Sequence, residues 1–464
     1  MIKFGTDGWR AVIAEDFTFE NIKIVSQAIS DYLNNQIKNK KKKVVIGYDT
    51  RFLSAEFAKT VGLVLAANNI KVVLSDKYIP TPVVSFHGLH DRYDLGIMLT
   101  ASHNPANFNG LKIKTKEGGS ADKSITDKVE KLLNKKKPKI IGLKEAKERG
   151  LFEIKDLTAS YVDFLKSFVD ILNIRKLKAR ILIDTMYGTG GSFIEKVIGG
   201  SRLSIDYIHN EFNPSFGGIH PEPVESNLKG LMGRVKKEGY DMGVALDGDA
   251  DRIAIIDSKG NYINAQVLLP LLAIHMIKNR KEKGGIGKTV VGSNVIDEVA
   301  LSLGAACYET PVGFKYLSSL FKENLICVGG EEAGGIGFRG YIPERDASCA
   351  FLLLLEMLAF TRQDLDKVLL NFYKSYGRWF YSRISVPAKS LKKGLESLKL
   401  LDNICGKKVE RINTLDGIKL IARDCWLMFR KSGTEPIVRV YAEAKSQKEA
   451  DRLLGLGKRM INDL

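Results

Sequence analysis

A serine and a histidine stand side by side in the stretch Thr100-Ala101-Ser102-His103-Asn104-Pro105. The apolar run 95–99 that precedes them is typical of a buried strand, and Pro105, which cannot donate a hydrogen bond to a sheet, predicts a loop at this point. Ser102 is therefore expected at the carboxyl end of a strand, where open α/β sheets bind their ligands. A serine beside a histidine could act as a nucleophile, although an isolated pair is more often part of an ordinary solvated loop.

An acidic cluster, Asp247-Gly248-Asp249-Ala250-Asp251-Arg252, follows a second apolar run at 243–246. The carboxylates of Asp247, Asp249 and Asp251 repel one another and cannot be buried without compensation. A hard divalent cation would relieve that repulsion, and Mg²⁺ suits a few carboxylates combined with a phosphate oxygen. The alternative is a solvated acidic turn, because turns favour Asp and Gly.

A basic cluster near the C-terminus, Arg430-Lys431-Ser432-Gly433-Thr434-Glu435-Pro436 with Arg439 three residues further on, has the composition of an anion-binding loop. The glycine lets the backbone approach an anion, the hydroxyl and N–H groups donate to it, and arginine adds two parallel hydrogen bonds. Taken alone, the stretch could equally be an ordinary turn.

In this order, TASHNP, DGDADR and R-x-SGTEP resemble the phosphoserine, metal-binding and phosphate-binding loops of the α-D-phosphohexomutases, the phosphoglucomutase/phosphomannomutase superfamily. Other stretches that resemble the family extend over the whole chain: GTDGWR at 5–10, GYDTR at 47–51, PEP at 221–223, TPVGFK at 310–315 and GEEAGG at 330–335. Eight short matches in the same order over 464 residues are not expected by chance.

The resemblance implies an α/β fold with four domains around a central cleft. Three related α/β domains with mixed, mainly parallel sheets would be followed by a C-terminal α+β domain. We place them at residues 1–148 (phosphoserine loop), 149–257 (metal-binding loop), 258–372 (sugar-binding loop) and 373–464 (phosphate-binding loop). The alternation of helix and strand patterns over the first 150 residues independently predicts a mainly parallel sheet, and from about Gly377 the pattern becomes antiparallel. In the third domain we expect a strand at Val290-Val291, and we interpret the glycine-rich stretch before it as structural.

The family's reaction is the reversible interconversion of hexose 1-phosphate and hexose 6-phosphate. By resemblance, Ser102 would carry the phosphoryl group, and a hexose 1,6-bisphosphate would serve as intermediate and activator. A Mg²⁺ ion would be held by Ser102, Asp247, Asp249 and Asp251. Positive charge around the transferring group would come from Arg10, Lys112 and Arg252. The general acid/base stays open between Lys112 and His103, and His103 could instead only orient the serine loop.

Substrate binding would fall to two distant loops. By resemblance, the sugar contacts are Glu331, Ala333, Gly313, Phe314 and Lys315, and the phosphate that is not transferred would be held by Arg430, Ser432, Gly433, Thr434 and Arg439. The family usually has Ser at position 333, and many bacterial members have His where this chain has Gly335. These departures leave open a catalytically weak paralogue that only binds sugar phosphates. The wording of TPVGFKYL and GGEEAGG favours glucose phosphate, with mannose phosphate as a second activity and phosphoglucosamine mutase as an alternative.

Composition restricts the remaining possibilities. The chain has 464 residues, of which 44% are hydrophobic, and no apolar run approaches the length of a membrane span, so we expect a soluble protein with no membrane partner. The N-terminus leads directly into a motif without a secretory signal, which predicts a cytoplasmic protein. Five cysteines without a C-x-x-C pair indicate neither zinc nor a disulfide framework. The net charge of +17 lies in scattered lysines, which argues against nucleic acid as a partner and leaves small hexose phosphates, with the chain a monomer or homodimer.

Overall fold

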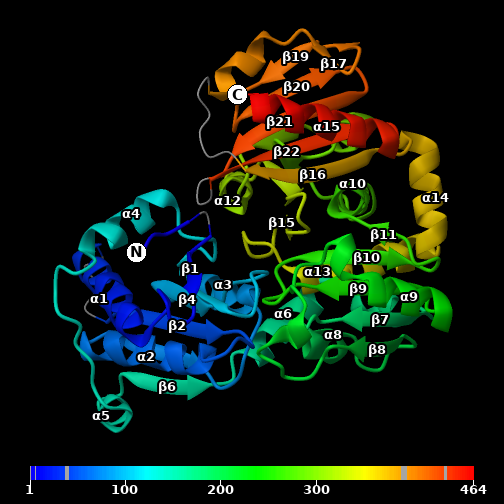
Figure 1. Cartoon of the computed structure of the whole chain (residues 1–464). Coiled ribbons are helices and arrows are strands. Elements are labelled where there is room, and N and C mark those ends of the chain that lie inside the picture. The colour runs from blue at the N-terminus through cyan, green and yellow to red at the C-terminus, as the bar shows by residue number, and fades with distance from the viewer. Residues whose placement is uncertain (1, 6, 37–40, 388–393, 433–435, 464) are drawn as a thin grey trace.

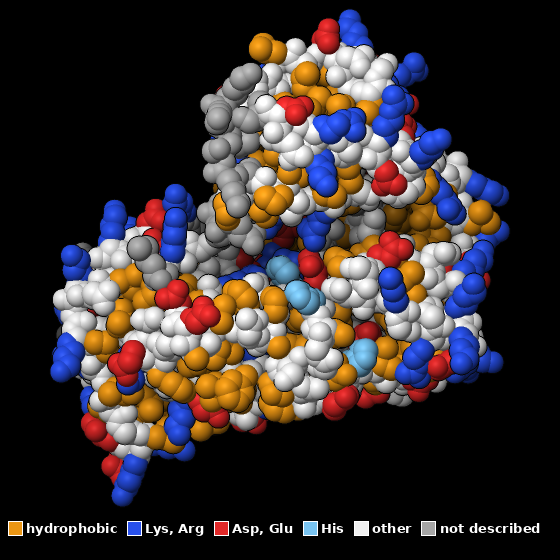
Figure 2. Space-filling model, viewed as in Figure 1, with side chains coloured by type: hydrophobic (Ala, Val, Ile, Leu, Met, Phe, Trp, Pro, Cys, Tyr) orange, Lys and Arg blue, Asp and Glu red, His pale blue; other side chains and the backbone are white. Residues whose placement is uncertain are grey.

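The computed structural model describes residues 2–5, 7–36, 41–387, 394–432 and 436–463 (Figure 1). Three mixed α/β sheets follow one another along the chain, and an antiparallel sheet ends it. Figure 1 shows the C-terminal domain above the other domains, and Figure 2 shows the surface hollowed between it and the domains below. This arrangement confirms the predicted fold class.

The first sheet has the order β1-β5-β4-β2-β3-β6. Strands β2, β3, β4 and β6 are parallel, whereas β1 and β5 are antiparallel to their neighbours. Because β6 pairs with β3, the sheet extends beyond residue 148, where we had placed the first domain boundary. The side chains of Ile22, Val25, Ile29 and Leu33, on one face of α1, are fully buried. The elements are β1 (Trp9–Val12), α1 (Phe19–Gln36), β2 (Lys43–Tyr48), α2 (Ser54–Ala67), β3 (Lys71–Ser75), α3 (Thr81–His90), β4 (Leu95–Leu99), β5 (Phe108–Thr115), α4 (Lys123–Leu132), α5 (Leu143–Glu148) and β6 (Phe152–Lys155).

The second sheet has the order β11-β10-β9-β7-β8, with β7, β8 and β9 parallel and the hairpin β10–β11 antiparallel. Its elements are α6 (Thr158–Phe168), α7 (Ile171–Ile174), β7 (Arg180–Asp184), α8 (Gly191–Ile198), β8 (Ser204–Ile208), η1 (Phe216–Gly218), η2 (Glu225–Asn227), α9 (Lys229–Glu238), β9 (Met242–Leu246), β10 (Ile253–Asp257) and β11 (Tyr262–Ile263).

The third sheet has the order β13-β12-β14-β15, with only β15 antiparallel. The strand that we expected at Val290-Val291 lies earlier, at β12 (Gly285–Thr289), so that prediction was wrong. Glycine is disfavoured in strands, but a Cβ at Gly287 would lie 2.7 Å from Ile326 Cδ1 and 2.8 Å from Leu317 Cδ2, so packing selects glycine here. The other elements are α10 (Ala265–Ile274), η3 (His275–Asn279), α11 (Asn294–Ser302), β13 (Cys307–Thr310), α12 (Phe314–Lys322), β14 (Ile326–Gly330), β15 (Ile336–Phe338), α13 (Ala347–Thr361) and α14 (Leu365–Tyr376).

The C-terminal sheet is antiparallel throughout, with the order β16-β22-β21-β20-β19, and α15 packs against it. This domain has a hydrophobic core of its own, whereas one core cluster runs through the second and third domains and reaches α3 of the first. The elements are β16 (Phe380–Pro387), η4 (Leu395–Leu400), β17 (Asn403–Ile404), β18 (Lys407–Lys408), β19 (Arg411–Asn413), β20 (Ile418–Ala422), β21 (Cys425–Lys431), β22 (Ile437–Ala444) and α15 (Gln447–Asp463).

The first three domains present their polar loops at equivalent positions. In each, a fully buried strand is parallel to a neighbour, ends in a polar loop and is followed by an antiparallel return strand. The pairs are β4–β5 around Ser102, β9–β10 around Asp247, and β14–β15 around Glu331. Parallel neighbours direct these strand ends to one edge of each sheet, which is where α/β folds bind ligands.

Within the described residues, no helix combines the length and the apolar character that crossing a membrane requires.

Candidate active site

Ser102 lies in a strained, buried loop directly after β4. Its side chain is fully buried, and its φ of 52° falls in the left-handed region that few non-glycine residues adopt. The backbone N–H of Ser102 donates to Thr100 Oγ1 at 2.8 Å, which fixes the turn. Its Oγ donates to Asp247 Oδ2 at 2.9 Å and lies 3.3 Å from His103 Nδ1. The hydroxyl is therefore held at the acidic loop of the second domain.

Arg51 fixes the conformation of the serine loop by hydrogen bonding. Its buried guanidinium donates to four carbonyl oxygens of the loop, at 2.6 to 3.0 Å: those of Ser102, Asn104, Pro105 and Phe108. Asp49 lies 3.2 Å from Arg51 Nε and completes this support. Both residues belong to the GYDTR stretch, to which the sequence analysis assigned no role.

The acidic loop approaches the serine loop closely because it contains a glycine. A Cβ at Gly248 would lie 2.7 Å from the carbonyl oxygen of Ser102, so a larger residue would push the two loops apart. Thr81 adds a second link between the domains, since its N–H donates to the Asp249 carbonyl at 3.0 Å and its hydroxyl donates to the Asp249 carboxylate.

Asp247, Asp249 and Asp251 form a buried cluster in which one carboxylate oxygen from each residue lies within 4.8 Å of the other two. Asp249 Oδ1 and Asp251 Oδ1 are buried without a hydrogen-bond partner among the described residues. Burial, followed by repulsion from Asp251 and Asp249, raises the pKa of Asp247 well above its ordinary value. A divalent cation with oxygen ligands would pair the free oxygens and would stabilise the ionised form of Asp247. The residues present therefore fit a metal such as Mg²⁺.

Lys112 and Asp7 are charged residues that lie against this cluster. The ammonium of Lys112 lies 2.7 Å from Asp249 Oδ2 and 3.0 Å from Asp251 Oδ2 and Asp7 Oδ2. Burial opposes the ammonium, but Asp249, Asp251 and Asp7 raise the pKa of Lys112. Lys112 therefore contacts the acids, and no described contact joins it to Ser102.

Arg345 is a central residue that the sequence analysis missed. Its guanidinium lies 2.6 Å from Asp7 and from Glu331 and 3.0 Å from Asp251, so it links the first, second and third domains. Burial works against a charge here, but Asp251, Asp7 and Glu331 raise the pKa of Arg345 well above its ordinary value. The signal in the sequence was the charged triplet Glu344-Arg345-Asp346 before the apolar helix α13, all of it buried.

Gly335 provides the space for Arg345. A Cβ at Gly335 would lie 3.4 Å from Arg345 Cβ and Cγ and closer still to its Cδ. The position where many bacterial family members have His is therefore covered here by the stem of an arginine whose charge enters the site.

Three other candidate residues surround the serine. Arg10 donates to Asn104 Oδ1 at 2.7 Å and lies 3.5 Å from Asp7. Arg252 lies 3.7 Å from Glu222 and 3.8 Å from Asp251. Burial, together with Arg252 and Arg10, lowers the pKa of His103 well below its ordinary value. The first and second domains thus bring all five predicted catalytic residues to one place.

The predicted sugar-binding residues divide into two groups. Glu331 is buried against Arg345, and Ala333 is half-buried two residues later. Gly313 adopts φ 131° at the start of α12, and Lys315 is half-buried beside it. Phe314 is only 4% exposed, and its ring packs in a core cluster 5.9 Å from the Arg345 guanidinium.

The predicted phosphate-binding loop lies in the C-terminal domain. Arg430 and Arg439 are register partners on β21 and β22, and the Ser432 N–H donates to the Ile437 carbonyl at 3.0 Å. Gly433 and Thr434 lie outside the described residues. Arg430 Nε donates to Asp416 at 2.8 Å, and no described contact joins this loop to the serine and the aspartates.

Comparison with known proteins agrees with this arrangement. Sequence models of phosphoglucomutase/phosphomannomutase domains I, II and III and of the C-terminal domain match residues 1–139, 159–260, 264–376 and 383–455. The chain is 30% identical over 462 residues to a phosphoglucomutase/phosphomannomutase of Thermococcus kodakarensis, covering 99% of this chain and 98% of the relative. It is also 30% identical over 463 residues to a phosphoglucosamine/phosphogalactosamine mutase of Sulfurisphaera tokodaii, with 99% and 98% covered. A crystal structure described as a phosphomannomutase, from Thermus thermophilus, superposes with a TM-score of 0.89 at 31% identity and 99% coverage of both chains.

The site combines a serine, an acidic cluster and several arginine and lysine side chains at the sheet edges of three α/β domains. Together with the matches to known proteins, it identifies the class: isomerases that move phosphoryl groups within sugar phosphates. The chain belongs to the phosphoglucomutase/phosphomannomutase family and is a phosphohexomutase.

Proposed function

We propose that the protein interconverts hexose 1-phosphate and hexose 6-phosphate through a phosphoserine at Ser102 and a hexose 1,6-bisphosphate. The observation that carries this proposal is the 2.9 Å hydrogen bond from Ser102 Oγ to Asp247 within the buried acidic cluster. In the reaction, the phosphoserine gives its phosphoryl group to the free hydroxyl of the sugar phosphate. The bisphosphate then reorients within the site and returns its other phosphoryl group to Ser102.

Catalysis would depend on positioning and charge rather than on further covalent steps. Asp247, Asp249 and Asp251, with Ser102, would hold Mg²⁺, which when bound supplies positive charge next to the phosphoryl oxygens. Arg10 and Arg252 would add charge at the transferring group. Lys112 would balance the acids, and either Lys112 or His103 would exchange the proton of the sugar hydroxyl.

We infer that Glu331 accepts hydrogen bonds from sugar hydroxyls, with Gly313 and Lys315 at the other end of the sugar. Arg430, Ser432, Gly433, Thr434 and Arg439 would hold the phosphate that is not transferred. One fixed phosphate site that receives either end of the substrate would explain how the bisphosphate can react at both positions. Motion of the C-terminal domain would open and close the site.

We favour glucose phosphate as substrate, with mannose phosphate as a second activity. Support comes from the amino-acid sequences of the loops around Gly313 and Glu331. Relatives named for glucose, mannose and glucosamine phosphates match the chain with similar identity, so identity does not separate these substrates. Phosphoglucosamine mutase is therefore the alternative.

The test is a coupled assay of glucose, mannose and glucosamine 1-phosphates with Mg²⁺ and a trace of the corresponding bisphosphate. We expect the highest kcat/KM with glucose 1-phosphate. Intact-mass measurement should find one phosphate on the active protein, and Ser102→Ala should remove both the phosphate and the turnover. Full activity of Ser102→Ala would refute the mechanism.

Ala333 and Gly335 favour one second candidate, a paralogue that binds sugar phosphates but turns them over weakly. Its test is the same assay: binding of glucose 1-phosphate by calorimetry without turnover would support it. Turnover of any of the three substrates with a kcat of about 1 s⁻¹ or more, the range of ordinary enzymes, would exclude it.

A further inference from the structure

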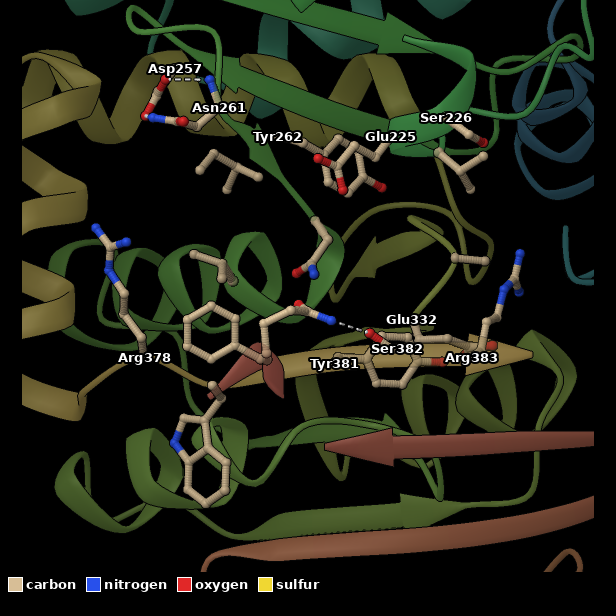
Figure 3. Close-up of a pocket in the computed structure, with 18 of the residues that line it drawn as sticks. Glu225, Ser226, Asp257, Asn261, Tyr262, Glu332, Arg378, Tyr381, Ser382 and Arg383 are labelled. Atoms are coloured by element: carbon tan, nitrogen blue, oxygen red, sulfur yellow. Dashed lines mark hydrogen bonds between the residues drawn. The ribbon is translucent and has the colours of Figure 1, made fainter. Parts of the chain in front are cut away.

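A cavity of about 630 Å³ opens where the second, third and C-terminal domains meet (Figure 3). The second domain contributes η2 and the β10–β11 hairpin, the third contributes the start of α10 and the pair Glu332-Ala333, and the C-terminal domain contributes β16. This volume falls within the range of small-molecule sites, which occur preferentially between domains. The cavity shares Ala333 with the predicted sugar-binding residues, so it borders the candidate active site. Its lining does not include Glu331, the serine or the aspartates.

The cavity also lies at the connection to the C-terminal domain. The chain leaves α14, passes through Gly377, Arg378 and Trp379, and enters β16; Arg378 and Trp379 line the cavity. Gly377 has a φ of 72°, in the region that favours glycine. A ligand here would contact three domains and their connection at once, so its binding would favour one position of the C-terminal domain.

The walls are aromatic and have unused hydrogen-bonding groups. Figure 3 shows Tyr262 and Tyr381 on opposite walls, and Trp379 adds an indole. Three buried polar atoms of the lining have no hydrogen-bond partner among the described residues: Asn264 Oδ1, Trp379 Nε1 and Tyr381 Oη. These three atoms are closed off from solvent in this structure, so a ligand reaches them only when neighbouring side chains move. A ligand hydroxyl that then bonds one of them would recover the cost of the unmet donor or acceptor.

The charges of the cavity disfavour an anion. Glu225 and Glu332 lie on opposite walls (Figure 3). The guanidinium of Arg383 already lies 3.0 Å from Glu222, and that of Arg378 lies 4.5 Å from the centre of the Tyr373 ring. A third carboxylate of the lining, Asp257, already accepts a hydrogen bond from Asn261. Three carboxylates and two engaged arginines repel an anion and suit an uncharged ligand that donates hydrogen bonds.

We propose that this cavity is a second ligand site, which binds an uncharged sugar or similar polyol and thereby fixes the position of the C-terminal domain. Aromatic rings would pack on the apolar faces of the sugar, while the amides, hydroxyls and carboxylates bond its hydroxyls. The inference is independent of which hexose phosphate the active site converts.

The test uses tryptophan fluorescence of the full chain with glucose and maltose as probes. The chain has three tryptophans; Trp9 and Trp426 are 1% and 0% exposed, so Trp379 is the one placed to respond. We expect a saturable change that Trp379→Phe removes. Ser226→Tyr, which fills the cavity from η2, should weaken binding by about tenfold or more. The matched control Ser204→Tyr, at an exposed position of β8, should bind as the native chain does.

A further variant separates this site from the active site. Glu331→Ala removes the carboxylate proposed to bind sugar hydroxyls there and should leave the fluorescence response unchanged, even when it abolishes turnover. Absence of a saturable response would overturn the proposal. So would a response that Glu331→Ala abolishes and Ser226→Tyr retains, or one produced by inorganic phosphate in place of the sugars.

Discussion

At the scale of single residues, steric space and neighbouring contacts determine which residue types and conformations the site can contain. Ser102 adopts a left-handed backbone conformation because Arg51 fixes the carbonyl groups of its loop, and the acidic loop reaches it because Gly248 has no side chain. Arg345 enters the site over Gly335 in the same way. Strain and close approach of this kind persist only where the surrounding structure enforces them.

Gly335→Ala is expected to displace Arg345 from Asp7, Asp251 and Glu331. Small misplacements of charged groups around a reacting centre are costly, so kcat should fall by about 10- to 100-fold while the fold is retained. Steady-state kinetics with circular dichroism as a check on folding would measure this. Gly230→Ala is the control, because a Cβ at Gly230 meets nothing within 4 Å; equal kinetics for the two variants would contradict the role of the space at Gly335.

Arg51→Lys should destabilise the serine loop, because a lysine cannot reach four carbonyl groups at once. We expect the free energy of unfolding to fall by about 3 kcal/mol, as for a broken buried ion pair, together with a lower kcat. Urea unfolding and kinetics test both effects. Arg149→Lys, at an exposed position in an ion pair with Glu145, should change neither.

At the scale of elements, strand ends and their loops couple the domains. Asp416, between β19 and β20, accepts hydrogen bonds from the Val312 N–H at 2.9 Å and from Arg430 Nε at 2.8 Å. It therefore joins the loop before α12 to the strand that leads into the predicted phosphate-binding loop.

Asp416→Ala should loosen both loops and leave the serine and the aspartates in place. We expect KM for the hexose phosphate to rise by about tenfold, the loss of roughly 1.4 kcal/mol, with a much smaller change in kcat. Steady-state kinetics decide this, with Asp402→Ala at an exposed position of the same domain as control. A fall in kcat at constant KM would show that Asp416 acts on the chemistry instead.

At the scale of the whole molecule, the third and C-terminal domains meet across a contact that contains a buried lysine. Lys419 Nζ donates to the Val290 carbonyl at 2.7 Å and lies 4.3 Å from the centre of the Trp426 ring and 3.7 Å from Glu309. Burial, with repulsion from Lys288, lowers the pKa of Lys419 from 10.5 to about 8. Protonated Lys419 thus destabilises the folded chain relative to the unfolded one.

This pKa makes stability depend on pH in one direction. Between pH 8 and 10.5 the folded state has lost the Lys419 proton while the unfolded state still binds it, so stability rises with pH in this window. Relative to Lys419→Met, the native chain should gain up to about 3 kcal/mol across it. Urea unfolding of both proteins at pH 8 and pH 10.5 would measure the difference; parallel pH profiles would show that Lys419 titrates normally.

Periodicity in the sequence by itself predicted a mainly parallel sheet over the first 150 residues and an antiparallel pattern from about Gly377, because these are local properties of the chain. The four-domain arrangement was implied by the resemblance of the motifs to a known family. The sequence also predicted the serine and acidic loops, since both directly follow apolar strands. Local rules failed where packing overrides propensity, as in β12, where Ile326 and Leu317 leave room only for a glycine at position 287. They were silent on Arg345, Arg51 and Asp7, whose positions depend on contacts between residues far apart in sequence.

Only the tertiary structure decided which charges meet. Three strand ends from separate domains converge, and the burial this produces turns separate acidic and basic side chains into one coupled cluster around Asp251. Charges interact strongly only where water is excluded. No single stretch of the chain can exclude water from this cluster, so the interactions form only when the domains pack together.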